Sequence, residues 1–127
     1  TGGMKLFRSL RDGYADGEQL RDFVYVRDVV DVCQWIMHHR KDSGLYNLGS
    51  GQARSFLDLT RATFDAISAP HNIGFIDTPA DIRDTYQYFT EADLSKLRSI
   101  GYDRTMTSLE EGVTEYVQEF LLKDAVL

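Results

Sequence analysis

The sequence has a single cysteine, Cys33, among its 127 residues. An internal disulfide is therefore excluded, and no cysteine and histidine residues have the spacing of a zinc site. So little cysteine is typical of a reducing compartment, and we expect a cytoplasmic protein. The length fits one domain, residues 1–127, and 43% hydrophobic residues are enough for one buried core.

Basic residues are also in deficit, because 14 Lys and Arg face 20 Asp and Glu for a net charge of -6. Proteins that coat nucleic-acid phosphates normally carry a basic excess, so we expect no nucleic-acid partner. Long apolar runs and a signal-peptide pattern are missing too, so we expect no membrane association. The chain begins at Thr1 without a methionine and enters a strand-like run almost at once, which indicates a fragment of a longer protein.

Hydrophobic periodicity predicts an α/β fold built from helices and short strands. Strands are expected at residues 4–7, 23–26, 45–48 and 73–76. Helices are expected at residues 29–40, 56–67, 92–100 and 109–121. Residues 8–20 and 81–89 are expected to be irregular, and a long connection of the first kind is often functional.

Capping residues predict where these helices begin. Asp28 is expected as the N-cap of the first helix, and this position explains it more simply than a catalytic pair with Asp31. Ser55-x-x-Asp58 and Thr107-x-x-Glu110 have the form of capping boxes. Gly101 is expected as a left-handed C-cap after the third helix, and Ser43-Gly44 as the end of the first.

Two other groups of residues admit either a chemical or a plainer interpretation. The Gly49-Ser50-Gly51 turn could bind phosphate, but the missing Gly-x-Gly-x-x-Gly pattern and lysine favour an ordinary turn between a strand and a helix. His38 and His39 could bind a metal, but neighbours on a helix point about 100° apart. Because no carboxylate joins them at helical spacing, we expect a solvated helix end and no metal.

Arginines and tyrosines give a more specific indication. Arg8, Arg11 and Arg21 lie in or beside the N-terminal loop, and a guanidinium can donate two parallel hydrogen bonds to a diphosphate. Surface solvation is the alternative for each of them. Tyr86 and Tyr88 alternate with polar residues, which fits core packing as well as sugar recognition.

Two motifs carry a resemblance to a known family. RDFVYVRDV at residues 21–29, followed by YNLGSG at residues 46–51, resembles the C-terminal half of extended short-chain dehydrogenase/reductase enzymes that act on nucleotide sugars. YQYFTEADL at residues 86–94, LRSIGY at 97–102 and EGVTEY at 111–116 most resemble the branch that epimerises ADP-linked heptoses at carbon 6. The likeness covers nearly the whole chain.

The resemblance implies an NADP-dependent isomerase of lipopolysaccharide heptose synthesis, which inverts one sugar carbon by transient oxidation and re-reduction. In that family the glycine-rich cofactor loop and a catalytic Tyr-x-x-x-Lys lie in an N-terminal Rossmann domain, and this chain has neither. We therefore expect a small C-terminal substrate-binding lobe without catalytic or cofactor-binding residues of its own. Its expected partners are an ADP-sugar, the Rossmann domain and, in the full-length enzyme, further copies in a homo-oligomer.

The family's substrate contacts transfer to five positions. Arg21 would bind the diphosphate, Tyr86 would contact the nucleotide sugar, and Phe7, Arg8 and Ser9 would line the mouth of the pocket. Arg8 departs from the branch, which has an acidic residue there, and the following loop is longer. A hexose 4-epimerase, a 4,6-dehydratase and a non-catalytic binding module remain the alternatives.

Overall fold

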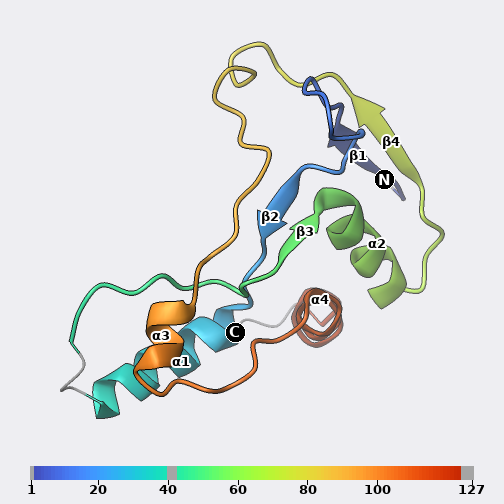
Figure 1. Ribbon diagram of the computed structural model, residues 1–127. Helices are drawn as coiled ribbons and strands as arrows, with labels where there is room; N and C mark the ends of the chain where they lie inside the picture. The colour runs from blue at the N-terminus through green and yellow to red at the C-terminus, as the bar shows by residue number, and fades with distance from the viewer. Residues whose placement is uncertain (1, 40–42, 124–127) are drawn as a thin grey trace.

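The computed structural model describes residues 2–39 and 43–123 and has the expected mixture of helices and short strands (Figure 1). Two strands precede the first helix: β1 (Met4–Phe7), β2 (Leu20–Asp22) and α1 (Val26–His38). The middle of the chain forms β3 (Ala53–Ser55), α2 (Phe56–Ala66) and β4 (Ile73–Ile76). The last part forms α3 (Ser95–Ser99), α4 (Leu109–Tyr116) and the π-helical turn η2 (Val117–Leu121).

The strands form two small sheets. β1 and β4 are parallel, with Met4 opposite Ile73 and Phe7 opposite Ile76. β2 and β3 are antiparallel, with Asp22 opposite Ala53. Helix α2 follows β3 without a break and contacts both β1 and α4, so it links the two sheets to the C-terminal helix (Figure 1).

An irregular segment, residues 86–92, runs beside β2. The Leu20 N–H donates to the Tyr88 carbonyl at 2.9 Å, and the Leu20 carbonyl accepts from the Thr90 N–H at 3.3 Å. Leu20 thus bonds to the residues on either side of Phe89, which is the hydrogen-bond pattern of parallel strands. The segment therefore lies along the free edge of β2 and pairs with it at Leu20.

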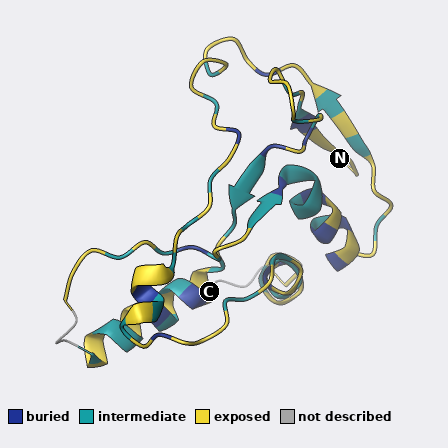
Figure 2. Cartoon of the chain, in the orientation of Figure 1, coloured by how far each residue is buried: buried dark blue, intermediate teal, exposed yellow. Residues whose placement is uncertain are grey.

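Burial is divided between the two ends of the molecule (Figure 2). At one end Val32 of α1, Leu97 of α3 and Tyr102 form a buried cluster, against which Trp35 and Ile36 pack. The other buried apolar side chains come from β1, α2, the segment beside β2 and η2, namely Leu6, Ala62, Phe64, Ala66, Tyr88 and Val117. In the described ranges no helix is long and apolar enough to cross a membrane.

The expected strands at residues 4–7 and 73–76 are confirmed, and so is the irregular crossing at 81–89. The expected strands at 23–26 and 45–48 are wrong. Leu20–Asp22 forms the strand instead, because its backbone finds partners on both sides, whereas residues 23–25 lead directly into α1. Tertiary pairing outweighs the higher strand propensity of the Phe-Val-Tyr-Val run.

The start of α1 also differs from the prediction. The helix begins at Val26 after Tyr25, so Asp28 lies in the first turn and is not the N-cap. Its carboxylate accepts instead from the backbone N–H and the hydroxyl of Thr107, both at 2.8 Å. The helix ends at His38, two residues before the predicted end, and Arg40 lies outside the described residues.

The Ser55–Asp58 capping box is confirmed, with both reciprocal hydrogen bonds present. The second box is wrong by one residue, because Ser108 and Glu111 form it. Thr107 is engaged by Asp28 and therefore cannot cap α4.

The third helix lies inside its predicted range, at Ser95–Ser99. Gly101 has the expected positive φ of 103° after it. The last helix is confirmed as well, but it widens into the turn η2 from Val117.

Candidate functional site

Three of the predicted site residues meet although they are far apart in the sequence. The guanidinium carbon of Arg21 lies 5.7 Å from the centre of the Tyr86 ring. The Phe7 ring meets Tyr86 edge to face, with 5.9 Å between the ring centres. The centre of the Phe56 ring, at the start of α2, lies 6.0 Å from the same guanidinium carbon. The end of β1, the middle of β2 and the segment beside β2 thus build one cluster.

The Arg21 side chain keeps its charge available. Its guanidinium donates one hydrogen bond, to the Leu20 carbonyl at 3.0 Å. Within the described residues it forms no ion pair with a carboxylate. Cation–π contacts engage the face of a guanidinium and leave its N–H edge free. A half-buried arginine of this kind is suited to bind an anion from outside the chain.

The Tyr86 hydroxyl lies at the same place. Burial raises the pKa of this phenol above its ordinary value, and the nearby Arg21 charge opposes the shift only in part. The hydroxyl therefore stays protonated at neutral pH and can donate a hydrogen bond.

Tyr88, two residues further on, belongs to the core. It is buried, and its hydroxyl accepts from the Leu10 backbone N–H at 2.9 Å. The Tyr14 ring packs on it with 5.3 Å between the ring centres, and the Arg11 guanidinium carbon lies 5.8 Å from the centre of the Tyr88 ring. Of the two interpretations of Tyr88, the geometry favours core packing.

Arg8 and Ser9 are occupied within the loop. Arg8 pairs with Asp16 at 3.2 Å and with Asp77 at 3.5 Å. The Ser9 backbone N–H donates to Asp16 at 2.8 Å, and its hydroxyl donates to the Arg11 carbonyl. Unlike Arg8 and Ser9, Phe7 contacts Tyr86 through its ring.

The Gly49–Gly51 turn binds a carboxylate of its own chain. One oxygen of Asp22 accepts from the Ser50 N–H at 2.7 Å and the Ser50 hydroxyl at 2.6 Å. The other oxygen accepts from the Gly51 N–H at 3.0 Å and the Ala92 N–H at 2.9 Å. The donors that a phosphate would need are therefore taken, and the phosphate-loop interpretation is wrong.

The glycines of this turn allow that arrangement. A Cβ on Gly49 would lie 2.4 Å from an Asp22 oxygen, and Gly51 has a φ of +74°. The expected link from a strand directly to a helix is also wrong, because β3 stands between the turn and α2. The sequence contains both halves of this contact, RD and GSG, but 28 positions separate Asp22 from Ser50.

The environment of Asp22 favours its ionised form. Burial acts to raise its pKa, but hydrogen bonds from Ser50, Ala92 and Gly51 outweigh this and hold the pKa below its ordinary value. The group is thus a carboxylate at neutral pH and not a general acid.

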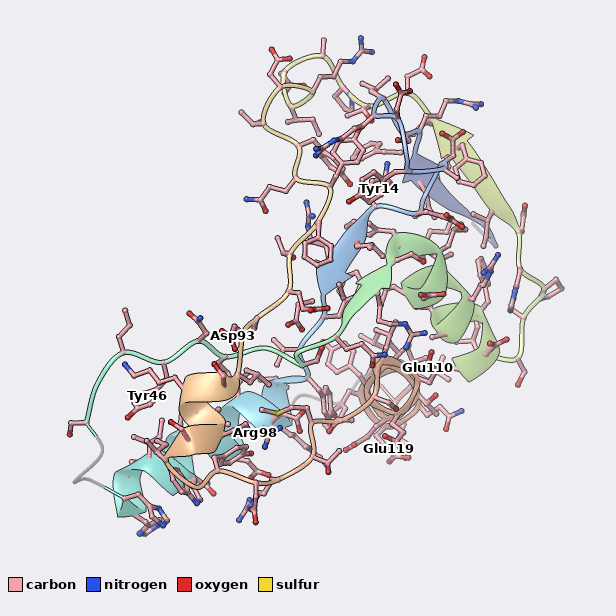
Figure 3. All side chains as sticks on the ribbon, viewed as in Figure 1. Tyr14, Tyr46, Asp93, Arg98, Glu110 and Glu119 are labelled. Carbon is pink, nitrogen blue, oxygen red and sulfur yellow. The ribbon has the colours of Figure 1, made fainter. Side chains whose placement is uncertain are left out.

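Two hollows of the described chain lie elsewhere. One, of about 510 Å³, is apolar and lies between residues 23–26, α2 and α4. The other, of about 560 Å³, lies near Asp93 and Arg98 at α3, away from the end of the molecule that holds Tyr14 (Figure 3). Arg21 and Tyr86 line neither of them.

His39 lies at the end of α1 with its ring stacked on Trp35, the ring centres 3.8 Å apart. Its Nδ1 is 2.7 Å from the Trp35 carbonyl oxygen. Across the described residues, no group of three or more His, Cys, Asp or Glu side chains could hold a metal ion.

Residues 6–49 match the model of the NAD dependent epimerase/dehydratase family. An ADP-L-glycero-D-manno-heptose-6-epimerase of Fusobacterium nucleatum is 51% identical over 98% of this chain. One of Nitratidesulfovibrio vulgaris is 47% identical over 94% of the chain. The chain spans 39% and 37% of these relatives, so it matches only part of each.

Solved structures agree with this similarity. An ADP-L-glycero-D-manno-heptose-6-epimerase of Helicobacter pylori has a TM-score of 0.69 and 28% identity, covering 92% of this chain and 32% of the other. A UDP-glucose-4-epimerase of Stenotrophomonas maltophila, with bound NAD, has a TM-score of 0.71 and 24% identity over 98% of this chain and 37% of the other, which supports the fold alone. The resemblance indicated by the sequence motifs is confirmed.

Proposed function

We propose that this chain is the substrate-binding part of a longer NADP-dependent ADP-glyceromanno-heptose 6-epimerase. The observation that carries the proposal is the half-buried Arg21 guanidinium, which lies within about 6 Å of two aromatic ring centres and forms no ion pair among the described residues. The 51% identity to a relative of that name supports the choice among nucleotide-sugar enzymes. The proposal also includes a cytoplasmic location, a homo-oligomeric full-length enzyme and a role in lipopolysaccharide core synthesis.

The described contacts suggest a role for each residue. Arg21 binds the diphosphate through its free N–H edge, because a charge-assisted and bidentate bond is the strongest that a side chain offers to such a group. Tyr86 donates its hydroxyl to the nucleotide sugar, and Phe7 holds the Tyr86 ring in place. Arg8 and Ser9 line the mouth of the site while Asp16 fixes them.

NADP would supply the oxidation and re-reduction of the sugar. The residues of this chain do not fit it, because the backbone N–H groups of the Gly49–Gly51 turn already bind Asp22. We therefore assign the cofactor and the proton-transfer residues to the rest of the longer protein. The task of this chain is to bind and orient the substrate.

One side of α1 fits the proposed contact with that remaining part. Val32 and Ile36 face the core, but Val26 and Val30 are 45% and 48% exposed, and Cys33 is exposed on the same side. Val26, Val30 and Cys33 recur at helical spacing i, i+4 and i+7 and form an apolar stripe. The relatives have more than half of their length outside the matched region. We therefore propose that this stripe packs against the cofactor-binding part of the longer protein.

This assignment predicts that Val30→Glu lowers the melting temperature of the full-length protein. Thr105→Glu, at an exposed position outside α1, introduces the same charge as the control and should leave it unchanged. Equal melting temperatures for both variants would contradict the assignment.

The function itself is tested by titration. The isolated chain should show neither epimerase activity nor saturable NADP binding, whereas the full-length protein should bind ADP-heptose and epimerise it at carbon 6. A micromolar NADP site on the isolated chain would show that the cofactor contacts are misplaced. Preference of the full-length protein for a UDP-hexose would favour a 4-epimerase, and a full-length protein that binds sugar nucleotides without turnover would favour a binding module.

A further inference from the structure

Asp22 joins three segments that are distant in the sequence. It ends β2, and its two oxygens together accept four hydrogen bonds from Ser50, Gly51 and Ala92. A carboxylate has about four lone-pair positions, so its accepting capacity is used in full. The neighbouring Arg21 has no ion pair among the described residues, because the Asp22 carboxylate is hydrogen-bonded to Ser50, Gly51 and Ala92.

These bonds set the position of the segment that carries Tyr86. Residues 86–92 have no regular secondary structure of their own. They are attached to β2 by the two backbone bonds of Leu20, to Tyr88 and Thr90, and then by the bond from Ala92 to Asp22. The last attachment is charge-assisted, as is the bond from the Ala53 N–H of β3 to the Glu91 carboxylate at 2.8 Å, and such bonds are roughly twice as strong as neutral ones. Of these two, the Asp22 bond is the one that fixes the segment to β2 itself.

We propose that Asp22 is a positioning residue for ADP-sugar recognition, whose carboxylate holds residues 86–92 beside β2 and thereby keeps Tyr86 against the Arg21 guanidinium. The inference rests on the proposed function, because its ligand is the ADP-sugar. It adds a residue that touches no substrate but determines the geometry of two that do.

A purely structural role is the competing explanation, and Asp28 provides the control. Asp28 is a buried carboxylate, and like Asp22 it joins distant segments, because it accepts two hydrogen bonds from Thr107. It connects α1 to the start of α4 and, among the described residues, forms no hydrogen bond to residues 86–92. Loss of either carboxylate should destabilise the fold, but only loss of Asp22 should release Tyr86.

Two substitutions weaken the Asp22 contact to different degrees. Asp22→Asn keeps the size of the side chain but places an NH₂ group opposite the Gly51 and Ala92 N–H donors or opposite those of Ser50. Ser50→Ala removes the 2.6 Å hydroxyl bond and leaves the three backbone bonds in place. Ser50→Ala therefore gives a milder form of the same defect, which is useful if Asp22→Asn folds poorly.

The experiment uses the full-length protein and compares wild type, Asp22→Asn, Ser50→Ala and Asp28→Asn below their melting temperatures. The dissociation constant for ADP-heptose is measured by calorimetry, KM and kcat by turnover, and hydrogen exchange by mass spectrometry on peptides that cover residues 86–92. For Asp22→Asn we expect the dissociation constant to rise about tenfold, the factor for loss of one well-placed contact to a charged group. KM should rise more than kcat falls, and exchange in residues 86–92 should accelerate.

Ser50→Ala should change the same quantities in the same direction but less, and Asp28→Asn should lower only the melting temperature. The inference is overturned if Asp22→Asn binds ADP-heptose as wild type does, or if Asp28→Asn weakens binding equally. Failure of the proposed function looks different, because the wild-type protein itself would then fail to bind ADP-heptose.

Discussion

The arginines at the two ends of the loop between β1 and β2 differ in their ion pairs. At the start of the loop, Arg8 is neutralised by Asp16 from the loop itself and by Asp77 after β4. At its end, Arg21 contacts the Phe56 and Tyr86 rings and has no ion pair among the described residues. The nearest acid in sequence, Asp22, is bound to the Gly49–Gly51 turn. An arginine is thus available for an anion only where the fold engages the neighbouring acid elsewhere.

The largest effect is expected for Arg21→Ala in the full-length protein. It should weaken ADP-heptose binding by about 1.5–3 kcal/mol, the range for a hydrogen bond to a charged group, with little change in stability. Arg21→Lys should restore only part of the loss, because an ammonium cannot donate two parallel bonds. Calorimetry and a thermal melt provide the measurements. A lowered melting temperature with unchanged binding would make Arg21 a structural residue.

Tyr86 should show a graded effect. Tyr86→Phe should weaken ADP-heptose binding by about 0.5–1.5 kcal/mol, the net value of one neutral hydrogen bond, and should leave stability nearly unchanged. Tyr86→Ala should weaken it more, because the ring that contacts Arg21 and Phe7 is lost as well. Denaturation and ligand titration should be run on both variants. If Tyr86→Ala lost about 3–5 kcal/mol of stability, as buried aromatics do, with intact binding, Tyr86 would be a core residue.

Asp22 should make stability depend on acid pH. Its pKa in the folded state is below the ordinary value of 3.8, so the ionised form stabilises the fold above that pH. This contribution is lost as the pH falls through the lowered folded pKa. The difference in melting temperature between wild type and Asp22→Asn should therefore be present at pH 7 and shrink toward pH 3. A difference that stays constant over this range would contradict the assignment.

The smallest effect is expected for Arg8→Ala. Exposed ion pairs contribute about 0–1 kcal/mol, and Arg8 is already neutralised, so ADP-heptose binding should change by less than about 1 kcal/mol. The measurement is the same calorimetric titration as for Arg21→Ala, which serves as its positive control. An equal loss in both variants would show that the substrate displaces Asp16 and Asp77 from Arg8.

Local signals in the sequence were sufficient for some elements. The apolar runs of β1 and β4 and the Ser55–Asp58 capping box depend on residues close in sequence, and all three are confirmed. β2 and β3 have three residues each and exist because each backbone finds a distant partner. No propensity of three residues can indicate such pairing.

The candidate site divides in the same way. The likeness of the motifs indicated Phe7, Arg21 and Tyr86, and these do lie together. Composition and spacing alone left Tyr86 and Tyr88 equivalent, since only the fold shows that Tyr88 bonds to Leu10. The role of Asp22 was missed because its partners follow 28 to 70 positions later.

The bonds of Tyr88 have a consequence for the entropy of binding. Its hydroxyl accepts from Leu10 in the loop, while its carbonyl accepts from Leu20 at the end of that loop. The loop and the segment with Tyr86 are thus restrained by one residue before any ligand arrives. Ordering a flexible backbone costs about 1–2 kcal/mol per residue, so a surface restrained in advance spends less of its interaction energy on ordering.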